Sequence, residues 1–188
     1  MRWANPIPRR AVLGCLALGV IFATGAVTFS EEPAGVKLER LNWSQLKERL
    51  AKSDARYTLV DAWATTCGPC KENFPHLVEM HHKYHKDGLA VLSLSLDDPA
   101  DTKAIAAAEQ FLKEQRAVFS NVLLDEEYGE GFEKLDINAI PAVFIFGPDG
   151  REVKRFTMDD PNNQFTYDQV ERTVVRLLRN PRDPDSAK

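Results

Sequence analysis

The sequence predicts an α/β sandwich with a mixed parallel/antiparallel sheet. Two apolar runs, residues 57–64 and 89–96, have the length and continuous hydrophobicity of strands that are buried on both faces. A helical segment follows each of them, and such alternation builds parallel strands through crossover connections. Near the C-terminus, a Pro-Asp-Gly turn at residues 148–150 separates two further short strands, which is typical of an antiparallel hairpin.

The first elements follow from local signals. Asn42 and Gln45 form a capping-box pattern, so we expect a helix to begin there. The strand at 57–64 comes next, and a helix is expected beyond Pro69 because proline suits the first helical turn. Pro75 lies inside that helix and is expected to kink it.

The later elements continue the alternation. After the strand at 89–96, Asp98 is expected to cap an alanine-rich helix that runs to about residue 116. An acidic, glycine-bearing stretch then extends through Leu135. The remaining elements are a short strand at 117–124, a hairpin at 142–157 and a closing helix whose capping-box start is Thr166 and Gln169.

The first 30 residues have the pattern of an export signal. Their only charged side chains are Arg2, Arg9 and Arg10, which precede an uncharged, mostly apolar stretch at residues 11–30. We expect a signal peptide that is either cleaved or kept as an N-terminal membrane anchor. Either outcome places the domain in the periplasm or on the outer face of the cytoplasmic membrane. A lipid-modified Cys15 and a buried core helix are the alternatives for this segment.

The rest of the chain is expected to form one domain. We divide the sequence into the export segment at 1–30, a tether at 31–37, a globular domain at 38–180 and a disordered tail at 181–188. Of the 24 basic side chains, 3 lie in the export segment, so the rest carries 21 basic and 28 acidic side chains, a net charge of −7. This argues against nucleic acid as the main partner, because phosphate binding needs a basic face. We expect a monomer that contacts the membrane only through its N-terminal segment.

Two of the three cysteines, Cys67 and Cys70, lie where the first buried strand gives way to a helix. A cysteine at a helix start faces unpaired backbone N–H groups and the positive end of the helix dipole, which favours the thiolate. We therefore expect Cys67 to attack a partner and Cys70, one turn deeper, to resolve the mixed disulfide. A disulfide that closes so short a loop adds little stability, which argues against a structural staple.

A metal-binding module is the alternative from another class. Its candidate ligands are the two cysteines and all four histidines, His76, His81, His82 and His85. His81 and His85 are spaced i, i+4 and could chelate from one helix face. However, a structural zinc site generally needs four ligands, and the chain has no second Cys-x-x-Cys. We expect neither a metal nor a cofactor, and we keep a metallochaperone as the second hypothesis.

Two motifs give the chain a resemblance to a known family. The segment Val60-Asp61-Ala62-Trp63-Ala64 followed by Cys67-Gly68-Pro69-Cys70-Lys71 resembles the active-site segment of thioredoxin, and Ile140-Pro141-Ala142 resembles the family's cis-proline loop. The export signal, the strand end Leu-Ser-Leu-Asp-Asp at 94–98 and the insertion before Ile140 are most similar to the TlpA-like branch of exported thiol–disulfide oxidoreductases.

The resemblance implies a thioredoxin-like three-layer α/β/α sandwich and the activity of a protein disulfide oxidoreductase. It implies that Asp61 is a buried acid that moves the proton of Cys70, that Trp63 packs beneath the active-site turn, and that Pro141 is cis and presents backbone groups to an extended substrate. Members of the branch commonly keep protein thiols reduced, including those of apocytochrome c. A reductant outside the cytoplasm also needs a membrane electron-donor protein.

Two details bear on specificity. Thr66 stands where the family usually has tryptophan, so the surface that docks a partner is expected to differ. Peroxide reduction is a third possibility on this fold. The sequence argues against it because the pattern Pro-x-x-x-Thr-x-x-Cys is absent.

Overall fold

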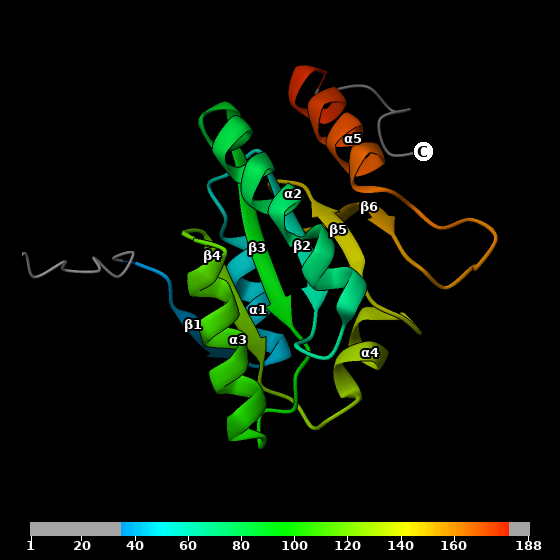
Figure 1. Cartoon of the computed structure of the whole chain (residues 1–188). Coiled ribbons are helices and arrows are strands. Elements are labelled where there is room, and N and C mark those ends of the chain that lie inside the picture. Colours follow the sequence, from blue (N-terminus) through cyan, green and yellow to red (C-terminus); the bar gives the residue numbers. More distant parts are fainter. Residues whose placement is uncertain (1–34, 181–188) are drawn as a thin grey trace, which may run out of the picture. The chain divides into compact units, whose positions relative to one another are not determined.

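The computed structural model describes residues 35–180 (Figure 1). The expected export segment, the tether up to residue 34 and the tail lie outside the described residues. The elements in chain order are β1 (Leu38–Leu41), α1 (Trp43–Ala51), β2 (Tyr57–Trp63), α2 (Gly68–Tyr84), the 3₁₀ turn η1 (His85–Asp87), β3 (Leu89–Ser95), α3 (Thr102–Glu114), β4 (Ser120–Leu124), α4 (Glu130–Leu135), β5 (Ala142–Phe146), β6 (Glu152–Phe156) and α5 (Tyr167–Arg179). No helix among them is long and apolar enough to cross a membrane.

The strands form one sheet in the order β1-β4-β3-β2-β5-β6. The first four are parallel to one another, β5 pairs antiparallel with β2, and β6 pairs antiparallel with β5, which confirms the mixed sheet. The strand β1 was not expected. It is an edge strand of four residues in which only Leu41 is buried, so it has neither the length nor the alternation that predicts a strand.

Helices cover both faces of the sheet, which confirms the three-layer sandwich. On one face, Leu59 and Trp63 of β2 join a buried cluster with apolar side chains of α2, α3 and α5. On the other face, Val60 and Ala62 join a second cluster with α1 and Leu135 of α4. Successive residues of a strand point to opposite faces, and right-handed crossovers place α2 and α3 on the same side of the parallel strands. Figure 1 shows these two helices in front of the sheet.

The helix starts confirm two predictions and correct one. Asn42 and Thr166 each accept the backbone N–H of a glutamine three residues on, and both capping boxes are complete. The prediction that Asp98 caps α3 is wrong. Its Oδ1 accepts the N–H of Ala100 in a preceding turn, and Asp101 caps the helix by accepting from residues 103 and 104. Both aspartates have the residue type that caps helices, and only the path of the chain selects between them.

Candidate active site

The two cysteines form a disulfide at the start of α2, and their Cα atoms are 5.3 Å apart. Cys67 is the N-cap residue, and the backbone N–H of Cys70 donates to its Sγ at 3.2 Å. Cys67 is partly exposed, whereas Cys70 is only 1 % exposed. The helix start therefore leaves one sulfur partly exposed beside an N–H group that can stabilise negative charge on it, and it buries the other sulfur.

The segment around Pro141 meets the disulfide. The peptide bond between Ile140 and Pro141 is cis, as the resemblance implied. The carbonyl oxygen of Ile140 lies 3.7 Å from Sγ of Cys67 although the two residues are 73 positions apart in the sequence. Strand β5 begins directly after Pro141 and pairs with β2, so the sheet itself brings both segments to the same edge.

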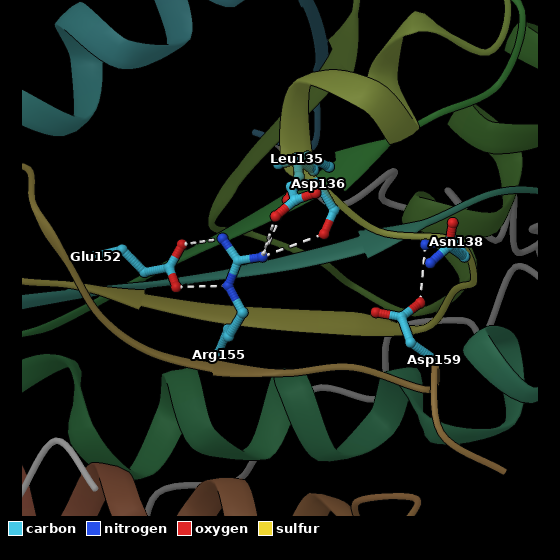
Figure 2. A network of polar contacts seen from close by, with 6 residues as sticks. All are labelled: Leu135, Asp136, Asn138, Glu152, Arg155 and Asp159. Carbon is cyan, nitrogen blue, oxygen red and sulfur yellow. Dashed lines mark hydrogen bonds and ion pairs between the residues drawn. The ribbon is translucent and has the colours of Figure 1, made fainter.

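A polar network fixes the chain before Pro141 (Figure 2). Arg155 of β6 donates to both oxygens of Glu152, at 2.7 and 2.8 Å, and to the backbone carbonyl of Asp136 at 3.2 Å. Asp159 accepts the backbone N–H of Asn138 at 2.8 Å, and this bond holds the pKa of its carboxyl below the usual value. The segment that leads to the cis bond is therefore tied to β6 and to the turn after it. No sequence motif predicted these contacts.

Asp61 lies in the middle of β2 and is 1 % exposed. Its Oδ2 accepts a hydrogen bond from the hydroxyl of Tyr167 at 2.7 Å, whereas its Oδ1 has no partner within residues 35–180. Burial raises the pKa of Asp61 to about 7, and the hydrogen bond from Tyr167 opposes this rise. Near neutral pH the carboxyl is thus suited both to take and to return a proton.

Two further residues support the turn that carries Cys67. Trp63 packs against Phe74 of α2 and Phe111 of α3, with ring centroids 5.5 and 5.1 Å apart, as the packing role predicted. Asp97, at the end of β3, was missed by sequence reasoning. Its carboxylate accepts the N–H of Thr65 at 3.0 Å and the hydroxyl of Thr65 at 2.6 Å, and so fixes the loop before the disulfide. The acidic end of the 94–98 motif was the available signal.

Thr66 is exposed and lines a groove beside the active-site turn. The groove has a volume of about 340 Å³. Apolar side chains of Leu96, Phe132 and Ile140 line it, together with the acidic side chains of Asp98 and Asp101.

The histidines do not gather around the cysteines. His76 stacks against Tyr167, with ring centroids 5.8 Å apart, and His81 stacks against His85 at 5.3 Å. The desolvation of His81, together with its histidine neighbours, lowers its pKa. In the described part of the chain, no three His, Cys, Asp or Glu side chains are placed to hold one metal ion.

Comparisons with known proteins agree with this geometry. Residues 34–155 match the AhpC/TSA family. The thiol-disulfide oxidoreductase ResA of Bacillus subtilis is 24% identical over 147 residues, which cover 77% of this chain and 76% of that protein. The protein of the same name from Oceanobacillus iheyensis is 24% identical over 102 residues, which cover 54% of this chain and 50% of that protein.

Solved structures are similar in fold. The thioredoxin domain of a thiol-disulfide oxidoreductase from Bacteroides vulgatus superposes with a TM-score of 0.53 at 20% identity, covering 70% of this chain and 83% of that one. A thiol:disulfide interchange protein from Bacteroides sp. superposes with a TM-score of 0.56 at 17% identity, covering 78% and 88%. The chain thus belongs to the thioredoxin-like AhpC/TSA family, in which its relatives and its Cys-x-x-Cys disulfide make it a thiol–disulfide oxidoreductase.

Proposed function

We propose that the chain is an exported reductant of protein disulfides and that Cys67 and Cys70 form its dithiol. The observation that carries this proposal is the placement of a partly exposed Cys67, at a helix start, against the carbonyl group that precedes the cis Pro141. This arrangement exposes one sulfur to a partner beside a loop whose backbone an extended peptide can pair with. The groove next to Thr66 supports a polypeptide substrate, because its volume can receive a large side chain.

The reaction begins with the reduced chain. The thiolate of Cys67 attacks one sulfur of a substrate disulfide, a mixed disulfide forms, and the other substrate sulfur leaves as a thiolate. Cys70 then gives its proton to Asp61, and its thiolate attacks Cys67. The Cys67–Cys70 disulfide forms, and the second substrate sulfur leaves and takes the proton back from Asp61. Two electrons have passed to the substrate, which carries two thiols once solvent has protonated the thiolate released first.

The proposal also covers the direction of electron transfer and the compartment in which it takes place. Gly68 and Pro69 between the cysteines, and Ile140 before the proline, resemble reducing thioredoxins. The N-terminal segment supports a position in the periplasm or on the outer face of the cytoplasmic membrane. The electrons then come from a membrane donor protein, and a disulfide of apocytochrome c, whose reduced thiols cytochrome c maturation needs, is one candidate substrate.

Trapping tests the proposal. The variant Cys70→Ser, expressed as the full chain in its host, is expected to accumulate mixed disulfides on Cys67 with membrane redox proteins and with secreted thiol proteins. The matched control is Cys67→Ser, which keeps only the buried sulfur and should trap none of them. A well-expressed Cys70→Ser variant that traps nothing, or a control that traps equally well, would contradict the assignment.

Two measurements on purified protein test the direction. The dithiol is expected to equilibrate with glutathione at a reduction potential below about −200 mV, in the range of thioredoxins and glutaredoxins. A potential close to that of strong oxidants would reverse the proposed direction. Sustained turnover of peroxide by the purified domain would instead favour the peroxidase activity that the sequence argues against.

A further inference from the structure

Tyr167 is the first residue of α5 and lies 106 positions after the acid that it contacts. Its hydroxyl donates to Oδ2 of Asp61 at 2.7 Å, and both residues are buried, with exposed fractions of 5 % and 1 %. Oδ1 of the same carboxyl has no partner among the described residues. Buried carboxylate oxygens are usually hydrogen-bonded. In Asp61, the hydrogen bond from Tyr167 holds Oδ2, whereas no hydrogen bond from the described residues holds Oδ1.

The phenol ring is itself firmly placed. The capping box of Thr166 and Gln169 fixes the first turn of α5, where Tyr167 begins the helix. The ring stacks on His76 of α2 at 5.8 Å and packs against Phe165 at 5.7 Å. Tyr167 thus links α2, the helix that begins at the disulfide, to the strand that carries Asp61.

We propose that Tyr167 is a positioning residue: its hydroxyl holds one oxygen of Asp61 and leaves the other free for the proton that Cys70 releases when it attacks Cys67. This inference rests on the proposed function, since it assigns a partner to the acid of that reaction. Asp61 lies on the face of β2 that also carries Leu59 and Trp63, and Cys70 packs in the same buried cluster as these two residues.

The electrostatics agree with the geometry. Burial raises the pKa of Asp61 to about 7, while the bond from Tyr167 lowers it because the bond stabilises the carboxylate. Burial and the neighbouring Asp61 raise the pKa of Tyr167 far above its ordinary value, so the phenol stays a donor at every working pH.

Few other titratable groups on the neighbouring elements bear on Asp61 and Tyr167. On α2 they are Cys70 and His76. On α5 the group is Glu171, which accepts hydrogen bonds from Tyr84 and Lys83 and interacts electrostatically with His76. The residues paired with Asp61 in the neighbouring strands are Ser93 of β3 and Val143 of β5, neither of which titrates near neutral pH.

The test is Tyr167→Phe in the full chain, which removes the hydroxyl and keeps the ring. The titration of the Asp61 carboxyl is followed by ¹³C NMR, and its midpoint is expected to rise by about one to two pH units, the shift that corresponds to a hydrogen bond to a charged group. The matched control is Tyr84→Phe, which removes a partly buried tyrosine–carboxylate bond to Glu171 and should leave the Asp61 midpoint unchanged. An unchanged or lowered midpoint in folded Tyr167→Phe overturns the proposal.

A second variant has the opposite expected sign. Site-specific 3-fluorotyrosine at position 167 is a stronger donor and should lower the Asp61 midpoint. It keeps the proposal falsifiable if Tyr167→Phe does not fold, because a midpoint that stays or rises overturns it.

A kinetic readout separates this proposal from the proposed function. The reduced protein is mixed with an aromatic disulfide whose thiolate product is coloured. Attack by Cys67 releases the first coloured thiolate, and attack by Cys70 on the mixed disulfide releases the second, so the two steps can be followed separately. The pH midpoint of the second step should shift with the carboxyl midpoint in Tyr167→Phe. If the carboxyl midpoint shifts and the second step does not, Tyr167 holds Asp61 as proposed, and the result counts against Asp61 as the acid of the exchange reaction.

Discussion

The substitution Asp61→Asn should stabilise the folded protein at alkaline pH and much less at acid pH. The pKa of Asp61 is raised from 3.8 to about 7 by its burial in β2. A raised carboxyl pKa means that the folded state holds the proton more tightly than the unfolded state does. The carboxyl therefore causes no loss of stability below about pH 4, a growing loss between pH 4 and pH 7, and its full loss above pH 7.

The magnitude follows from the difference between the two pKa values. About three pH units, at about 1.4 kcal/mol for each unit, give about 4 kcal/mol of destabilisation above pH 7. Asparagine has nearly the same shape, carries no charge to desolvate, and can still accept the hydroxyl hydrogen of Tyr167 through its carbonyl oxygen.

Urea unfolding of the oxidised protein at pH 4.0 and pH 8.5 measures this effect. The difference in unfolding free energy between Asp61→Asn and the parent chain should be about 4 kcal/mol larger at pH 8.5 than at pH 4.0, because all other titrating groups are common to both chains. Asp54→Asn, at an exposed position, is the control and should show about the same difference at both pH values. A difference for Asp61→Asn that does not change with pH would refute the claim that burial raises the pKa of this carboxyl.

Three further predictions concern the frame around the site. Phe74→Ala should lower the unfolding free energy by about 3–5 kcal/mol in urea, because Phe74 is 1 % exposed and packs edge-on against Trp63; a loss below about 1 kcal/mol would contradict this packing. Thr166→Ala should cost about 1 kcal/mol by the same assay, whereas Thr166→Ser keeps the cap and should cost little; equal losses would contradict the capping role. Gly150→Ala should destabilise more than Gly129→Ala by thermal unfolding. Both have positive φ, but only at Gly150 would the new Cβ lie 2.7 Å from a backbone atom, the Cα of residue 51; the reverse order would contradict the close approach.

Local patterns in the sequence predicted much of the frame. The buried runs that became β2 and β3 and the capping boxes of α1 and α5 were recognisable because each depends on residues within a few positions of one another. The disulfide at the start of α2 follows from the same kind of local signal. Strand β1 and the six-residue helix α4 were not recognisable, because each is too short to show a period and forms only by packing on the rest of the domain.

The sequence by itself determined the chemical groups of this protein, namely two cysteines at a helix start, a carboxyl in a buried strand and a proline far along the chain. Only the tertiary structure decided what surrounds them. It placed the carbonyl of Ile140 against Cys67, the hydroxyl of Tyr167 on Asp61 and the carboxylate of Asp97 on the loop before the disulfide. The physical reason is that hydrogen bonds and desolvation depend on distance in space, and these partners lie 73, 106 and 32 positions apart, where no local pattern can connect them.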